Sequence, residues 1–212
     1  MESKHEGMSS SVAGVRLPVG VTIRPYRPLD HNACRRRWGE LVEHTGELYG
    51  RAAPRRPSGN GNGNEADHDP SAGFEEYLTR LDLSGMWVAE GVEDGVVGFV
   101  GLIASPSYAQ IQGGVGDDGR AGAVEPIVVT RRLRGQGIGR ALLTTVADVA
   151  RRRGLRRLTV SPSARDHAAL RSLHAAGFGA VSSVTLTCAL TRAGQSSGQD
   201  EELDLYDLRF HT

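Results

Sequence analysis

The chain has 212 residues and a formal net charge of zero, with 25 basic and 25 acidic side chains. That length fits one domain. The neutral charge disfavours a general nucleic-acid-binding protein, which would be basic overall. No stretch approaches the roughly 18 consecutive apolar residues of a membrane helix, and the first residues carry no apolar run typical of a signal peptide. We therefore expect a soluble cytoplasmic protein that binds neither nucleic acid nor membrane.

The chain has only two cysteines, Cys34 and Cys188. This number excludes a disulfide framework and disfavours a cysteine-ligated zinc site. We expect both side chains to be small buried apolar groups, and we expect no metal.

The first half of the chain contains two predicted helices and a low-complexity insertion. Residues 1–19 are polar and aperiodic, so we expect them to be disordered. Val21–Pro25 has the β-branched alternation of a strand, and Asp30 can cap a helix whose apolar positions through Val42 share one face. From about 54 to 73 the chain is rich in Gly, Pro and Asn, which predicts a flexible insertion. A short helix follows, with Phe74, Tyr77, Leu78 and Leu81 at helical spacing.

The second half alternates strands and helices. Met86–Ala104 is predicted to form a hairpin around an Asp-Gly turn. In the strand Ala123–Val129, Pro126 requires a bulge or an unpaired position. A helix is predicted from Gly137 to the basic turn before Gly154.

The last elements complete a mixed α/β pattern. We expect a strand at Leu155–Val160, a helix capped by Asp166, and strands at Val181–Leu190 and Leu203–Phe210. The apolar residues of that helix expected to face the core are Ala169, Leu170 and Leu173. The order of elements predicts a single α/β domain over residues 20–212, without an internal repeat.

The most informative segment is Ile127–Ala141, with the sequence IVVTRRLRGQGIGRA. A strand runs into a glycine-rich turn that opens directly into a helix. Such a turn leaves several backbone N–H groups unpaired beside the positive end of the helix dipole, which favours a phosphate or pyrophosphate. The turn carries three glycines and two flanking arginines: Gly135, Gly137, Gly139, Arg134 and Arg140.

Both common nucleotide motifs fail at this turn. The Walker motif needs a lysine, which is absent here, and the dinucleotide fingerprint needs glycine where Arg140 or Leu142 stands. The spacing that remains is Arg134-x-x-Gly137-x-Gly139. In this setting, EPIVVTRRLRGQGIGRALL resembles the acetyl-CoA-binding motif of the GNAT superfamily of N-acetyltransferases. The segment HAALRSLHAAGF resembles the last helix of that family, which ends in Gly-Phe.

The resemblance implies a fold, a co-substrate and a reaction. The fold would be a mixed twisted sheet of about seven strands flanked by about four helices. The reaction would move an acetyl group from acetyl-CoA to an amine of a small molecule or protein, by direct attack in a ternary complex. The residues implied to bind acetyl-CoA are Ile127, Val128, Val129, Arg134, Gly135, Gln136, Gly137, Ile138, Gly139 and Arg140.

The resemblance also indicates catalytic candidates. Glu125 stands where many members place the general base, and a carboxylate beside an apolar strand is suited to accept a proton. The usual acid is a tyrosine four residues before the terminal glycine, but that position is Leu173. His174 is a weak candidate for the acid, and Asp166 replaces a frequent asparagine.

Several alternatives stay open. The missing tyrosine would also suit a non-catalytic acyl-CoA-binding sensor or regulatory module. A phosphate-binding regulator of nucleic acid is a third reading, which the neutral charge disfavours. Independently of these, Glu125 could be an ordinary exposed strand residue, and the glycine-rich turn could be only a tight strand–helix connection. The exposed edge of the last strands would support a homodimer, as in many relatives.

Overall fold

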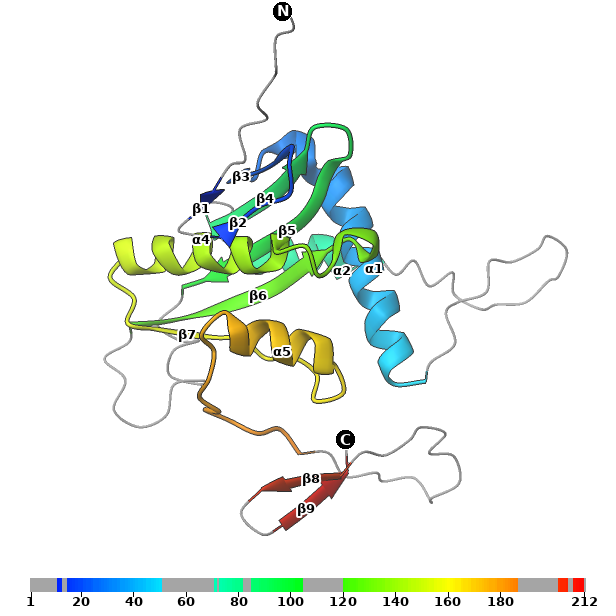
Figure 1. The fold of residues 1–212 in the computed structure, drawn as a ribbon, viewed down its shortest axis with the longest axis vertical. Helices are drawn as coiled ribbons and strands as arrows, with labels where there is room; N and C mark the ends of the chain where they lie inside the picture. Colours follow the sequence, from blue (N-terminus) through cyan, green and yellow to red (C-terminus); the bar gives the residue numbers. More distant parts are fainter. Residues whose placement is uncertain are drawn as a thin grey trace, which may run out of the picture.

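The centre of the molecule is a five-stranded mixed sheet (Figure 1). The computed structural model describes residues 11–12, 15–50, 71, 73–81, 85–104, 120–186, 202–205 and 208–211. In spatial order the strands are β3 (Val21–Pro25), β4 (Met86–Gly91), β5 (Gly95–Ile103), β6 (Ala121–Val129) and β7 (Arg157–Thr159). Neighbouring strands are antiparallel except β6 and β7, which are parallel.

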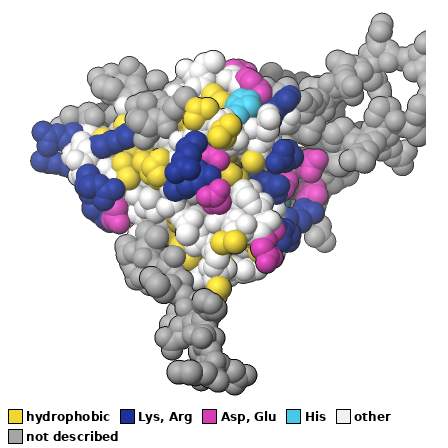
Figure 2. Space-filling model, turned by 90° about the horizontal axis from the view of Figure 1, so that it is seen from above, with side chains coloured by type: hydrophobic (Ala, Val, Ile, Leu, Met, Phe, Trp, Pro, Cys, Tyr) yellow, Lys and Arg dark blue, Asp and Glu magenta, His cyan; other side chains and the backbone are white. Residues whose placement is uncertain are grey.

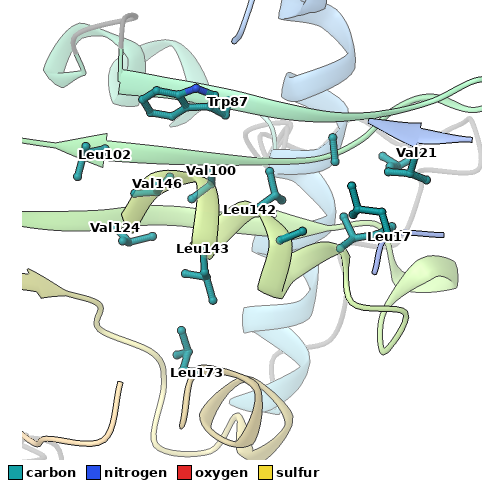
Figure 3. Packing of buried hydrophobic residues seen from close by; sticks show 14 of the residues in the cluster. Leu17, Val21, Trp87, Val100, Leu102, Val124, Leu142, Leu143, Val146 and Leu173 are labelled. Carbon is teal, nitrogen blue, oxygen red and sulfur yellow. The ribbon is translucent and has the colours of Figure 1, made fainter. Parts of the chain in front are cut away.

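In the described part of the chain, four helices cover the two faces of this sheet. They are α1 (His31–Leu48), α2 (Gly73–Arg80), α4 (Ile138–Arg152) and α5 (His167–Ala175). The helices α1 and α2 pack on one face through a cluster that includes Phe74, Tyr77 and Phe99. The helices α4 and α5 cover the other face. There Leu142 and Leu173 join a second cluster, here named the α4-side cluster (Figure 3). Because both faces are covered, β5 is buried along almost its whole length.

Short elements complete the described chain. Two-residue strands pair as β1 (Ser11–Val12) and β2 (Val15–Arg16), and single 3-10 turns form η1 (Pro28–Asp30) and η3 (Arg131–Leu133). A separate hairpin is formed by β8 (Glu202–Leu205) and β9 (Leu208–His211). None of the helices in the described ranges is both long and apolar enough to cross a membrane. Basic side chains on the face seen in Figure 2 are interspersed with acidic and apolar ones.

A bulge in β6 confirms the prediction made from Pro126. Glu125 and Pro126 together stand opposite the single residue Gly101 of β5. The paired residues on either side are Val100 with Ile127 and Leu102 with Val124. All four pack with the α4-side cluster, so the extra residue keeps Val124 and Ile127, which are three positions apart, on the same face of the sheet.

The sheet has fewer strands than the sequence indicated. Residues 181–186, predicted as the start of a strand, form no strand, and Val181 and Leu186 are exposed. Residues 187–190 lie outside the described part of the chain. The single strand predicted at 203–210 is instead the hairpin β8–β9, in a sheet of its own. The central sheet therefore has five strands in the described chain, and the expected seven are not confirmed.

The phase of the apolar residues in the sequence indicates a hairpin here instead of the single strand predicted. Apolar residues alternate at Leu203 and Leu205, and again at Leu208 and Phe210, but the two runs are out of phase. In one continuous strand they would lie on opposite faces. In the hairpin, Leu203 pairs with Phe210 and Leu205 with Leu208.

Other local expectations had mixed outcomes. Leu173 is buried as expected, whereas Leu170 is exposed on α5, which corrects its expected inward position. Cys34 is buried, and Cys188 lies outside the described residues. Most of the 54–73 insertion and residues 1–10 also lie outside them, so their predicted disorder stays a prediction. Leu17, within the stretch expected to be disordered, is buried in the α4-side cluster.

The start of α1 is fixed by an ion pair instead of the predicted side-chain cap. Asp30 makes no capping hydrogen bond to α1. Its carboxylate accepts hydrogen bonds from Arg24 at 2.7 and 2.8 Å and from the Arg27 amide at 2.8 Å. Arg24 also donates to Glu90 on β4. The Arg24 guanidinium holds the pKa of the Asp30 carboxyl below its usual value, although burial acts to raise it.

We predict that Asp30→Asn lowers the free energy of unfolding by about 2 kcal/mol at neutral pH, because it breaks a largely buried pair. The folded-state pKa of Asp30 is depressed, so its contribution is complete above the unfolded-state pKa. It is lost as the pH falls through the folded-state pKa, and the difference between variant and wild type should shrink there. Urea unfolding at several pH values measures this. Glu90→Gln, whose side chain is 41% exposed, is the matched control and should cost less. A pH-independent difference would contradict the assignment.

Candidate functional site

The glycine-rich segment forms a tight connection between β6 and α4. After Thr130 the chain makes the turn η3, extends at Arg134 and then passes through Gly135 and Gly137. These two glycines have φ values of 77° and 88°. Side chains with a Cβ rarely adopt such values, so the turn depends on glycine at both positions. Gly139 differs from these two, because a Cβ there would meet Val129 at 3.7 Å, an ordinary van der Waals distance, so the packing of α4 on β6 does not require glycine at this position.

The first turn of α4 presents its backbone N–H groups without a side-chain cap. Gly137 is the N-cap residue, and neither a capping side chain nor an acidic first-turn residue is present. The helical hydrogen-bond ladder begins when the Ala141 amide donates to the Gly137 carbonyl at 3.0 Å. The N–H groups before it and the helix dipole therefore favour an anion at this end.

Beside this turn, β6 separates from β7. The two strands pair only from Ala121 to Ala123 on β6, against Arg157 to Thr159 on β7. The remaining part of β6, residues 124–129, has no β7 partner in the continuously described stretch 120–186. Backbone groups on this edge of β6 are therefore available to an extended ligand, at the end of the strand that leads into the turn.

The C-terminal half of α1 lies beside the end of β6 and the start of α5 (Figure 1). On the β6 side, Thr130 and Arg37 contact Glu40. On the β7 side, His44 Nε2 lies 2.8 Å from Asp166 Oδ2 at the start of α5. Tyr49 and Ser163 hydroxyls are 3.0 Å apart. The helix thus forms a polar wall between the end of β6 and the start of α5.

Asp166 has two partners at the start of α5. It caps the helix as predicted, because its Oδ1 accepts a hydrogen bond from the Ala169 amide at 2.9 Å. Burial acts to raise the pKa of the Asp166 carboxyl, but the hydrogen bonds from Ala169 and His44 outweigh it, and Arg134 adds a favourable charge. The pKa of Asp166 therefore lies below its usual value, and the group is ionised at neutral pH.

The residues predicted to bind acetyl-CoA lie along one continuous path. Ile127 and Val129 pack toward α4, and Val128 is buried on the α1 side. The Arg134 side chain turns back, and its Nε donates to the Val129 carbonyl at 3.0 Å. The remaining members of the predicted set are two exposed side chains, Gln136 and Arg140, and the buried Ile138.

The two catalytic candidates lie in different places. Glu125 is half-buried at the β6 bulge, on the same strand as the path described above. His174 is exposed in the last turn of α5. It is eight residues beyond Asp166, about 12 Å along the helix axis. Leu173, at the position of the tyrosine in many family members, is buried in the α4-side cluster. Glu125 therefore lies on the strand that leads into the turn, whereas His174 lies at the opposite end of α5 from Asp166.

Sequence reasoning missed the polar residues on α1. His44 and Asp166 are 122 positions apart, so their contact has no local signal. A helical spacing of three to four residues does connect Arg37, Glu40, His44 and Glu47. That pattern marks one charged helix face. It does not show that this face meets the glycine-rich turn, where Glu47 pairs with Arg131.

A family model described as the acetyltransferase (GNAT) family matches residues 34–179. The matched segment includes α1 from Cys34 onward, the sheet from β4 to β7, the glycine-rich turn and α5. The chain belongs to the GNAT family. This confirms the resemblance read from the motif.

Solved GNAT structures share the fold at low sequence identity. An acetyltransferase of the family from Staphylococcus aureus Mu50 is 17% identical, with a TM-score of 0.51 over 74% of this chain and 83% of that one. A ribosomal-protein-alanine N-acetyltransferase from Brucella melitensis is 23% identical, with a TM-score of 0.51 and the same coverage. A candidate acetyltransferase from Salmonella typhimurium, solved with its cofactor acetyl-CoA, is 23% identical, with a TM-score of 0.50 over 74% and 78%. The comparison with curated proteins finds no match.

We predict that two variants of Asp166 in this GNAT domain separate the contribution of its helix cap to stability from the contribution of its charge. Asp166→Ala removes both the cap of α5 and the carboxylate beside His44, and should lower the free energy of unfolding by about 1 to 2 kcal/mol. Asp166→Asn keeps a capping oxygen and should cost less than half as much. Urea unfolding compares the two. Equal losses would show that the cap contributes nothing.

Proposed function

We propose that this GNAT protein is an N-acetyltransferase that moves an acetyl group from acetyl-CoA to an amine. The observation that carries the proposal is the uncapped start of α4 beside the unpaired edge of β6. The start of α4 favours a pyrophosphate, and the edge of β6 favours an extended arm that contains amide groups. Acetyl-CoA contains both chemistries in one molecule, and membership of the family supports the same donor.

The described residues fit this co-substrate. The amides from 135 to 140 would hold the pyrophosphate, with added charge from Arg134 and Arg140. The edge of β6 at residues 127–129 would hydrogen-bond to the pantetheine arm. Gly135 supports the fit, because a Cβ built there meets nothing within 4 Å and the turn is open on that side. No group of three metal-ligating side chains occurs among the described residues, and the proposed chemistry uses no metal.

The proposed reaction is a direct transfer. The amine nitrogen attacks the thioester carbon, and a new N–C bond forms as the carbonyl oxygen becomes an oxyanion. A backbone amide, from Val129 or its neighbour, would stabilise that oxyanion. Glu125 accepts the proton that the amine loses, directly or through water. The C–S bond then breaks, and coenzyme A leaves as the thiolate.

The missing tyrosine is compatible with this scheme. An ordinary thiol has a pKa near 8.5, so a thiolate is a tolerable leaving group near neutral pH and takes its proton from solvent. His174 stays a weak candidate for the acid because it lies at the far end of α5. The acceptor is an amine of a small molecule or a protein.

A second candidate function is a non-catalytic acyl-CoA-binding module. The burial of Leu173 in the apolar core favours it, because that position supplies no acid. Such a module would bind acetyl-CoA and release no thiol with any amine. A thiol-release screen over small amines, amino acids, aminoglycosides and peptide N-termini separates the two functions. Release with any of these amines supports the enzyme.

We predict that Glu125→Gln lowers kcat by about 100-fold and leaves the Kd for acetyl-CoA within twofold, because the change removes the base and keeps the shape. Steady-state thiol release and calorimetry measure the two quantities. Glu93→Gln, in the exposed turn between β4 and β5, is the control for loss of one charge. Turnover equal to wild type across pH would refute the base assignment.

We predict that Gly137→Asp weakens acetyl-CoA binding at least tenfold, because it places a carboxylate where the pyrophosphate would lie. Gly154→Asp is the matched control, since Gly154 also has a positive φ, of 76°, but lies after the opposite end of α4. Both variants force a residue with a Cβ into a positive-φ conformation, so both lose stability for the same reason. Calorimetry should show loss of affinity for the first only. Equal affinities in folded proteins would refute the placement of the pyrophosphate.

A further inference from the structure

Tyr77 on α2 reaches the main chain of the proposed base. Its hydroxyl donates a hydrogen bond of 2.7 Å to the backbone carbonyl of Glu125. The Tyr77 side chain is completely buried. A buried tyrosine hydroxyl requires a polar partner, and here the partner is the carbonyl at the β6 bulge.

The approach of Tyr77 to this carbonyl depends on Gly101 of β5. A Cβ built on Gly101 would overlap both the Tyr77 hydroxyl and the Glu125 carbonyl oxygen. Gly101 is also the single residue that faces the two residues of the bulge. The bulge, the glycine opposite it and the tyrosine hydroxyl therefore form one arrangement, in which each part requires the others.

The aromatic ring of Tyr77 is itself held firmly. It stacks on Trp38 of α1 with ring centroids 5.1 Å apart and an angle of 27° between the planes. Phe74 lies beside it, with centroids 6.3 Å apart. The hydroxyl is thus presented to β6 from a packed cluster and not from a mobile side chain.

A bulge interrupts the regular ladder and sets the direction of the side chains that it carries. Rotation of the Glu125 peptide would move the Glu125 carboxylate as well as its carbonyl. The Tyr77 hydrogen bond restrains this rotation, because it fixes the carbonyl end of the same residue. Proton transfer depends steeply on the position of the base, so the restraint affects kcat more than substrate binding.

We propose that Tyr77 is a positioning residue for Glu125, acting through the hydrogen bond to its backbone carbonyl. The proposal rests on the proposed function, in which Glu125 is the base. It assigns α2 a part in the reaction without contact between Tyr77 and substrate.

The test is a double-mutant cycle of Tyr77→Phe and Glu125→Gln. We expect Tyr77→Phe to lower kcat about tenfold, to leave the Kd for acetyl-CoA within twofold, and to add less than twofold in the Glu125→Gln background. Phe74→Leu is the control for weakened packing in the same cluster, and should lower the melting temperature while keeping kcat.

A readout without an acceptor amine accompanies the kinetics. Hydrogen exchange of β6 amides should increase severalfold in Tyr77→Phe relative to Phe74→Leu, with α4 unchanged. Unchanged exchange in β6, wild-type kcat, or an equal loss of kcat in both backgrounds overturns the positioning role. Full activity of Glu125→Gln instead refutes the base in the proposed function, while the exchange data still show whether Tyr77 holds the bulge.

Discussion

The candidate site depends on one constraint in the sheet: β6 pairs with its antiparallel partner β5 from Ala123 to Val129 around the bulge, but with its parallel partner β7 at only three positions. β7 pairing ends at Ala123, so that edge of β6 lacks a β7 partner over residues 124–129, which lead into the turn before α4. The same strand therefore offers backbone groups along its edge and uncapped helical N–H groups at its end. The two features could not serve one ligand if β6 were paired on both sides.

The bulge at Glu125 and Pro126 allows β6 to contain a proline beside its open edge without loss of core packing. One extra residue keeps Val124 and Ile127 on the α4 face, so the α4-side cluster stays continuous. Across the gap, the polar face of α1 joins Thr130 to Asp166 through Glu40 and His44. Hydrogen bonds and ion pairs from α1 therefore connect the end of β6 to the start of α5, where no β ladder joins them.

The sequence was most informative where a local rule has one structural solution. Proline in a strand predicted the bulge, and glycines at fixed spacing before an apolar helical pattern predicted the turn and α4. It was least informative where two distant segments compete for one group. Aspartate is a common helix cap, but the Asp30 carboxylate pairs with Arg24 of β3 instead of capping α1. The contact of His44 with Asp166 depends on how α1 crosses the sheet. Residues 181–186 have the residue types of a strand but form none, because a strand also needs the edge of a neighbouring strand to pair with.

The most direct test of the account is a titration of the isotope-labelled protein with acetyl-CoA, followed by ¹H–¹⁵N spectra. We expect the largest amide shifts at residues 127–129 and 135–140, with small shifts in β3 and at the far end of α4. That pattern would place the pantetheine arm on the free edge of β6 and the pyrophosphate at the start of α4. Unchanged amides in both segments at saturating acetyl-CoA would contradict the account.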